Sequence, residues 1–178
     1  MNDIVRVDHV FDYNDSLGCE TLHPLVSVID FSEVRPIRSS LRSFGVYAIF
    51  LKDVKCGDMI YGRQTYDYQE GTLVCLAPGQ VFGAKDDGQL RQPKGWALLF
   101  HPDLLRGTQL GRNIRNYTFF SYEVREALHL SEQERRTILD CLHNIRHELQ
   151  HAIDRQFITR SDVAGKDILA RFERTLDD

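Results

Sequence analysis

The pattern with the most definite chemistry in this sequence is His147-Glu148-Leu149-Gln150-His151. Two histidines one helical turn apart, with a glutamate beside the first, have the spacing that binds a zinc ion and places a carboxylate to activate water. His143 extends the row to three histidines at i, i+4 and i+8. The motif therefore raises the hypothesis of a zinc hydrolase, which the helix around it can test.

The helix that carries the motif turns the histidines away from its apolar side. Ser131-Glu132-Gln133-Glu134 matches a capping box, so we expect a helix from Glu132 to about Asp154. At ~100° per residue, the apolar side chains fall within about 60° of Leu142, and the histidines lie about 100° to 180° from it. A catalytic zinc site needs a walled cleft and a third protein ligand, for which the sequence offers only the distant Glu173. A solvated helix face is the favoured interpretation.

The apolar stripe of this helix is a candidate dimer interface. It consists of Ile138, Leu142, Ile145, Leu149 and Ile153. This spacing suits helix-on-helix packing. The alternative is that the stripe packs on the chain's own strands, and the sequence favours neither.

Composition excludes several classes of protein. The chain has 178 residues, 42% of them apolar, and a net charge of −4, which suits one globular domain and lacks the basic footprint of a nucleic-acid binder. No apolar run approaches the length of a membrane span, and the N-terminus lacks a signal-peptide pattern. The cysteines are far apart, which is typical of reduced thiols in a cytoplasmic protein; they are Cys19, Cys56, Cys75 and Cys141.

The elements that must position any site change character near residue 101. Before it, short apolar runs punctuated by Gly and Pro predict strands in a β-sandwich or barrel, at Pro24–Phe31, Phe44–Lys52, Met59–Tyr68, Thr72–Ala77 and Trp96–Phe100. The second of these runs is apolar on both faces, so we expect it to be an interior strand. A short helix is expected around Val7 to Leu17. After residue 101 the periodicity becomes helical, and besides the capped helix we expect helices from Phe119 to about His129 and from Ser161 to Leu176.

Several stretches resemble known regulators. Glu70-Gly71 through Pro78-Gly79-Gln80-Val81-Phe82 resembles the second half of a cupin, in which a glycine turn leads into a buried strand that ends in Pro-Gly. Leu22 to Phe31, Trp96 to Leu105 and Phe119 to Ser131 resemble AraC-type transcriptional regulators of a Bacteroidetes-like branch. The resemblance covers about residues 20 to 178.

The resemblance implies a mainly β fold with C-terminal helices. Its parts would be an N-terminal arm (1–22), a cupin-like effector-sensing barrel, or double-stranded β-helix (23–105), and a helical linker and dimerisation region (106–178). It implies a small-molecule effector, a homodimer, and DNA contact only through a helix-turn-helix unit of ~100 residues. Only 24 residues follow Asp154, so we expect that unit to lie outside this chain.

The sequence departs from metal-binding cupins. They carry a His-x-His pair with a glutamate and a later histidine, whereas Tyr61 to Gln69 and Gly79 to Gly83 hold no histidine. We therefore expect no metal, no cofactor and no catalytic residues, with a metal-dependent cupin enzyme as the alternative and a zinc peptidase as a weaker one. Similar chains also have an apolar helical stretch where Arg155 meets Gln156 here.

The candidate ligand-binding residues are Tyr47, Tyr61, Arg63 and Trp96, which would supply apolar walls and one polar anchor inside a barrel. A shift of one residue in strand register would turn any of them outward. Arg35, Arg38 and Arg42 form a basic loop that is either an anion site or, as we favour, a solvated surface.

Overall fold

The computed structural model describes residues 3–52, 58–61, 64–67, 71–117, 120 and 128–151, with the backbone alone for 58–61 and 64–67. The elements run in the order β1 (Val5–Val7), α1 (Val10–Leu17), β2 (Val26–Asp30), η1 (Phe31–Glu33), β3 (Ile37–Arg38), β4 (Leu41–Phe44), β5 (Tyr47–Lys52), β6 (Asp58–Tyr61), β7 (Gln64–Asp67), β8 (Thr72–Leu76), β9 (Gln80–Gly83), β10 (Leu90–Arg91), β11 (Trp96–Phe100), η2 (Pro102–Leu105), α2 (Gln109–Asn113), η3 (Ile114–Asn116), β12 (Leu128–His129) and α3 (Glu132–Gln150). The η elements are short 3₁₀ helices.

The described strands form two sheets of five and a two-stranded ribbon, β10-β3. The first sheet has the order β1-β4-β9-β6-β7, and the second has the order β12-β8-β5-β11-β2. All pairs are antiparallel except β1 with β4. The fold is therefore a mixture of mostly antiparallel sheets and helices, and no ladder among the described strands joins the two sheets into one closed barrel.

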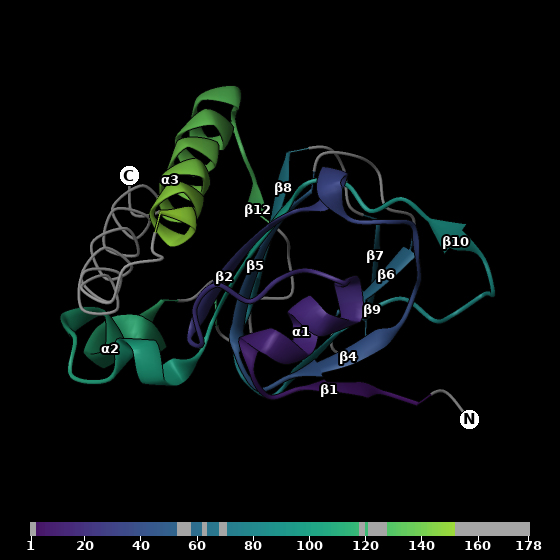
Figure 1. The fold of residues 1–178 in the computed structure, drawn as a ribbon, viewed down its shortest axis with the longest axis horizontal. Helices are drawn as coiled ribbons and strands as arrows, with labels where there is room; N and C mark the ends of the chain where they lie inside the picture. Colours follow the sequence, from purple (N-terminus) through teal and green to yellow (C-terminus); the bar gives the residue numbers. More distant parts are fainter. Residues whose placement is uncertain are drawn as a thin grey trace.

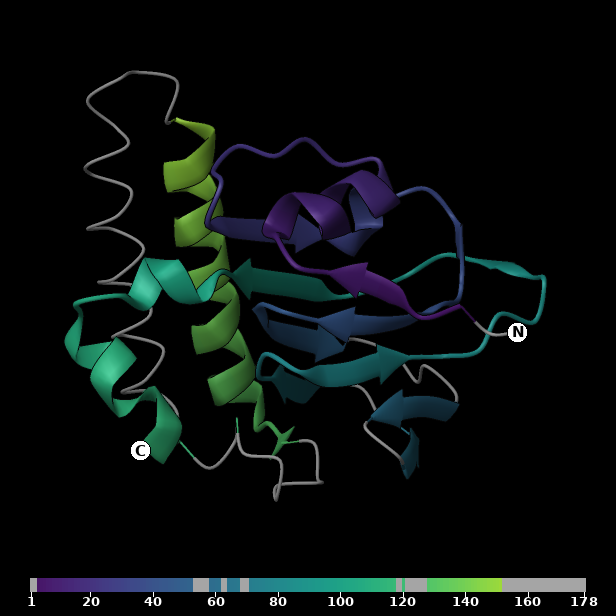
Figure 2. The same cartoon turned by 90° about the horizontal axis from the view of Figure 1, so that it is seen from below.

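The second sheet is buried on both faces. Along β5, Ile49 and Leu51 belong to one apolar cluster, which α3 and the segments after β11 cover. Ala48 and Phe50 belong to the other cluster, which the first sheet and α1 cover. Successive side chains of a strand point to opposite faces, so this sheet is the middle layer of three (Figure 1, Figure 2). The prediction of an interior strand apolar on both faces is confirmed.

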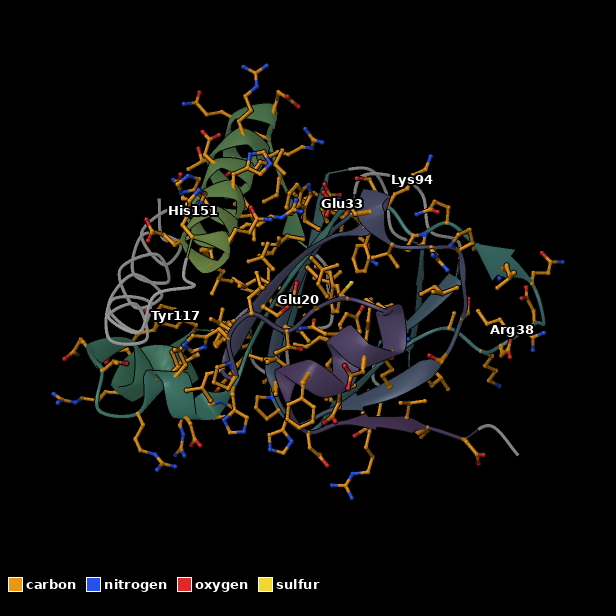
Figure 3. The ribbon with its side chains drawn as sticks, viewed as in Figure 1. Glu20, Glu33, Arg38, Lys94, Tyr117 and His151 are labelled. Atoms are coloured by element: carbon orange, nitrogen blue, oxygen red, sulfur yellow. The ribbon has the colours of Figure 1, made fainter. Side chains whose placement is uncertain are left out.

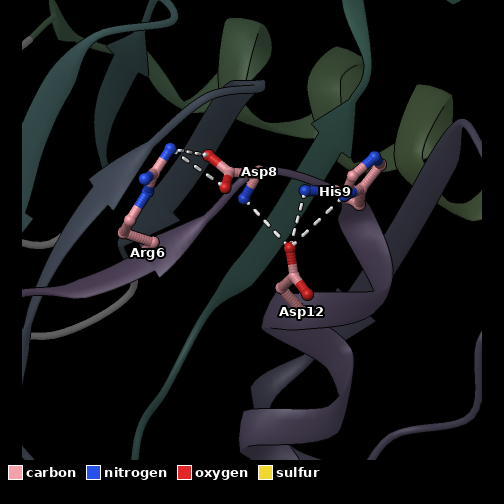
Figure 4. A network of polar contacts seen from close by, with 4 residues as sticks. All are labelled: Arg6, Asp8, His9 and Asp12. Carbon is pink, nitrogen blue, oxygen red and sulfur yellow. Dashed lines mark hydrogen bonds and ion pairs between the residues drawn. The ribbon is translucent and has the colours of Figure 1, made fainter.

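The N-terminal segment is part of this packing. β1 pairs with β4, and α1 buries Val10 and Tyr13 in the cluster between the sheets. The first turn of α1 is closed by the Asp12 carboxylate, which accepts backbone hydrogen bonds from Asp8 (3.0 Å) and His9 (2.8 Å) (Figure 4). The segment that the resemblance makes an arm thus supplies a strand and a helix.

The capping box of α3 is confirmed. The Ser131 hydroxyl accepts from the backbone N–H of Glu134 (3.3 Å), and the Glu134 carboxylate accepts from the backbone N–H of Ser131 (2.6 Å). α3 ends at Gln150, and residues 152–178, with the last expected helix, lie outside the described residues. Within the described residues no helix combines the length and apolar character that a membrane span requires.

The expected helix from Phe119 to His129 is wrong at its end. Leu128 and His129 form β12, which pairs with Leu73 and Thr72 of β8. The backbone N–H groups of β8 need partners at the sheet edge, and this demand outweighs a local helical pattern. Most of the preceding stretch, residues 118–119 and 121–127, lies outside the described residues.

The apolar stripe of α3 packs on its own chain. Its four described members are at most 6% exposed and share a cluster with the central sheet; they are Ile138, Leu142, Ile145 and Leu149. This is the second of the two alternatives, so the prediction that these four side chains form a dimer interface is corrected: the sheet already removes them from water. Ile153 lies outside the described residues.

Leu142→Ala is expected to lower the free energy of unfolding by about 2–5 kcal/mol, because it opens a cavity between α3 and the sheet. The milder Ile138→Val should cost about 0.5–1.5 kcal/mol. Leu90→Ala is the control, since Leu90 is 67% exposed, and should be close to neutral. Urea denaturation gives the free energies. A Leu142→Ala chain of unchanged stability but altered sedimentation mass would contradict this packing.

Candidate functional site

A lysine is buried between the two sheets. Lys52, the last residue of β5, is 8% exposed and shares the inward face of that strand with Phe50. Its Nζ lies 5.7, 5.2 and 5.6 Å from the ring centroids of Phe31, Phe50 and Phe82. Lysine is rarely buried, because desolvating its charge is costly, and aromatic faces offset part of that cost. We refer to Lys52, Phe31, Phe50 and Phe82 as the Lys52 cluster.

A buried hydroxyl stands beside the lysine. Thr72 of β8 is the direct partner of Lys52 in the β5–β8 ladder, and directly opposed residues share a face of the sheet. Thr72 is 0% exposed, and its Oγ1 has no hydrogen-bond partner among the described residues. Buried hydroxyls are usually satisfied, so this pairing of an ammonium with an unused donor and acceptor marks a candidate binding point.

A second cation approaches the interior from the first sheet. Arg42 of β4 is paired with Phe82 of β9, so both side chains lie on the same face of that sheet. The Arg42 guanidinium carbon lies 5.2 Å from the centroid of the Tyr13 ring. Its buried Nε has no hydrogen-bond partner among the described residues. Two cationic side chains, one from each sheet, thus border the same aromatic interior.

The described charged side chains at this interior are cationic. Among the described residues the buried polar side chains include no carboxylate; they are Asn14, His23, Ser27, Lys52, Thr72 and Gln80. Burial raises the pKa of Tyr13 to about 12, an effect that the nearby Arg42 charge partly opposes. The tyrosine is therefore neutral at ordinary pH and adds no negative charge. The chemistry of these side chains suits an acidic group beside an apolar or aromatic surface.

Two predicted pocket residues lie on the other side of the central sheet. The Tyr47 ring packs on Phe100 and Phe120, with centroids 5.0 and 5.2 Å away. Trp96 packs against His143 of α3 (4.8 Å). Both face the helices and not the interior that holds the Lys52 cluster, because the side chains of a strand alternate and the inward positions of β5 are the even-numbered ones. Their assignment to a ligand pocket stays a prediction.

Of the other two predicted pocket residues, one lies in a described strand. Tyr61 closes β6, where it is the register partner of Phe82, and Arg63 lies outside the described residues. Sequence analysis missed Lys52 and Thr72. The available signal was a charge at the end of the apolar run Val46–Leu51, in phase with Ala48 and Phe50.

The three arginines of the predicted basic loop lie in two different environments. Arg35 and Arg38 are exposed, and Arg38 (Figure 3) lies 3.9 Å from the Asp86 carboxylate. A surface pair of this kind contributes little. The favoured interpretation of a solvated surface therefore describes these two residues, whereas Arg42 belongs to the interior.

The zinc motif lies on an exposed helix face. His143, His147 and His151 are all exposed, and His151 sits at the end of α3 (Figure 3). The rings of His147 and His151 stack at 4.0 Å, and the Nδ1 atom of His151 is 2.7 Å from the carbonyl oxygen of His147. No group of three or more metal-binding side chains is found among the residues that the structure describes, and Glu173 lies outside them.

No disulfide joins the described cysteines, which are Cys19, Cys75 and Cys141. Burial raises the pKa of the Cys75 thiol well above its usual range, and burial together with the charge of Glu33 raises the pKa of Cys19. Neither thiol is activated as a nucleophile, because the thiolate is the reactive form. Cys56 lies outside the described residues.

Comparison with known proteins supplies no identity for this site. No model of a protein family matches the chain, and no curated protein is significantly similar to it.

Alkaline pH should test the burial of Tyr13. Its pKa is raised to about 12 in the folded chain, against about 10 in the unfolded chain. The phenol's contribution to stability is therefore present below pH ~10 and is lost as pH rises toward ~12, by an amount on the order of 2–3 kcal/mol. Guanidinium unfolding across this range should show a smaller loss for Tyr13→Phe than for the unaltered chain. Parallel curves would contradict the burial of a neutral phenol.

Proposed function

We propose that this chain is a regulatory small-molecule-binding domain of the AraC type, with a cupin-like arrangement of its two sheets. The observation that carries the proposal is the Lys52 ammonium, enclosed by three aromatic rings beside the Thr72 hydroxyl, which has no hydrogen-bond partner within the described part of the chain. The domain binds an effector and performs no catalysis. It acts as a homodimer in the cytoplasm, through a DNA-binding unit of the kind that the resemblance implies.

The path of the chain between the sheets supports a cupin-like arrangement. β8 belongs to the second sheet and β9 to the first, and Pro78-Gly79 joins them, with Gly79 at φ 97°, where glycine is favoured. The backbone N–H of Gly79 donates to the carbonyl oxygen of Phe44 (2.7 Å), at the end of β4, just before the chain crosses to β5. Two crossings between the sheets are thus tied together at one edge.

The ligand that this interior suits is an aromatic or apolar monoanion. Its acidic group would accept hydrogen bonds from the Lys52 ammonium, which has three N–H donors, and from the Thr72 hydroxyl. Its body would lie among Phe31, Phe50 and Phe82, where rings bury apolar area and favour offset or edge-on contacts. A neutral analogue of the same shape would gain the apolar contacts and lose the charge-assisted ones.

The test compares aromatic carboxylates with their amides. Benzoate, salicylate and indole-3-acetate, each beside its neutral amide, are titrated by calorimetry into the whole chain. At least one acid should bind at least about 10-fold more tightly than its amide, which corresponds to about 1.4 kcal/mol. Equal affinity for every pair, or no binding of any acid, would reject the proposed ligand class.

The matched variants are Lys52→Met and Lys94→Met. Lys52→Met keeps the length and volume of the buried side chain and removes its charge, so it should weaken acid binding about 10-fold or more while leaving amide binding in place. Lys94 is exposed (Figure 3), and its variant should bind like the unaltered chain. Thr72→Val serves as a second variant of similar shape. Full acid affinity in both interior variants would contradict the site.

A further inference from the structure

One short segment touches both the interior site and the outer helix. η1 follows β2 directly and consists of Phe31, Ser32 and Glu33. Phe31 is 3% exposed and forms one wall of the Lys52 cluster. Asp30 and Glu33, on either side of the phenylalanine, reach Arg146 of α3. The two faces of the central sheet are thus connected through four consecutive residues.

On the outer face of the sheet, Arg146 is held by two carboxylates and an aromatic ring. The guanidinium of Arg146 lies 3.7 Å from the Asp30 carboxylate, forms a close hydrogen-bonded ion pair with Glu33, and stands 5.6 Å from the centroid of the Trp96 ring. The Arg146 side chain is 23% exposed. An arginine that two carboxylates and an aromatic ring hold in a half-buried place fixes the position of its helix more firmly than an exposed pair does.

Hydrogen bonds hold the segment between the two contacts together. The side-chain amide of Gln92 donates to the carbonyl oxygens of Phe31 (3.0 Å) and Val34 (2.8 Å). The Asp30 carboxylate accepts from the backbone N–H of Ser32 (2.9 Å). These bonds hold the turn closed on itself, so a displacement of the Phe31 ring carries Glu33 with it.

There is also room for α3 to respond. A cleft of about 280 Å³ lies between β2, the loop after α1 and α3, and its walls include Asp30, Glu33, Arg146 and Leu149. Close-packed interfaces resist displacement, whereas an interface beside an open cleft lacks part of that resistance. The Arg146 contact therefore adds to the restraint that the buried Ile145 and Leu149 place on this part of the helix.

We propose that η1 couples the interior site to α3: a ligand that displaces the Phe31 ring from Lys52 shifts η1, weakens the hold of Asp30 and Glu33 on Arg146, and releases the C-terminal half of α3. This coupling rests on the proposed function, since it assigns a regulatory output to the same site. The ligand acts by binding the released arrangement better than the held one.

Thermodynamic reciprocity predicts the direction in which ligand affinity changes when the Arg146 contact is broken. If ligand binding weakens the Arg146 contact, then breaking that contact must strengthen ligand binding by the same factor. Arg146→Met should therefore bind an interior anion at least about 5-fold more tightly, within the usual range of allosteric coupling. General damage to the fold would weaken binding at the interior instead.

The first experiment uses 8-anilinonaphthalene-1-sulfonate, an aromatic anion, as a fluorescent probe of the whole chain. Arg146→Met should show the tighter binding, and the double variant Lys52→Met/Arg146→Met should lose it, which separates the interior site from nonspecific apolar surface. The matched control is Arg136→Met, because Arg136 lies on the same helix and pairs only with the exposed Glu132, at 3.2 Å. Unchanged or weaker binding by Arg146→Met would overturn the coupling.

The second experiment needs no ligand and measures hydrogen exchange of the backbone amides. Phe31→Leu should speed exchange at residues 145–149 of α3 by about 10-fold, while the amides of β5 serve as the reference for global stability. Phe82→Leu alters the same Lys52 cluster from β9, whose described ladders run to β4 and β6, and should leave α3 unchanged. Equal effects of the two variants, or no effect of Phe31→Leu, would overturn the coupling. If the probe bound without dependence on Lys52 but the exchange pattern were as expected, the proposed function would be rejected. The structural coupling between η1 and α3 would then stand.

Discussion

The structure depends on one constraint: a central sheet with two apolar faces must be covered on both. The side chains of β5, β8 and β11 are buried on either side, so neither the first sheet nor the helices can be removed without exposing a core. α3 is therefore an obligatory part of the fold, and its apolar stripe is used up within the chain. A dimer of this protein would have to use another surface.

Against this background the placement of Lys52 is informative. An ammonium in an apolar core carries a cost of desolvation that a methionine of similar volume would avoid. The lysine instead stands beside the hydroxyl of Thr72, and the other cation at the interior, Arg42, comes from the opposite sheet. Groups that are expensive to bury and that gather in one place are more typical of a binding site than of a scaffold.

The sequence predicted those features whose cause is local. A continuous apolar run identified β5 as interior, and the Ser131–Glu134 pattern located the start of α3, because both depend on neighbouring residues. The strand at Leu128 and His129 was not predicted, because it forms only by pairing with β8, whose residues are far away in the sequence. The same holds for two of the predicted pocket residues. Tyr47 and Trp96 were chosen by residue type, whereas strand register decides which side of the sheet each side chain faces. Lys52 was overlooked because a charged residue is ordinarily taken to be at the surface.

β12, the shortest strand of the central sheet, protects the neighbouring strand β8 from aggregation in concentrated solution. β8 is buried along its whole length, and the segment Thr72 to Ala77 carries no charge. Its outer edge is paired by the two residues of β12 alone among the described strands, with one further bond from the Leu130 N–H to the Gly71 carbonyl. Uncharged apolar segments with an open edge are templates for intermolecular β-pairing. Brief fraying of two residues would thus expose such a template, and the resistance of this chain to aggregation depends on how firmly that short strand is held.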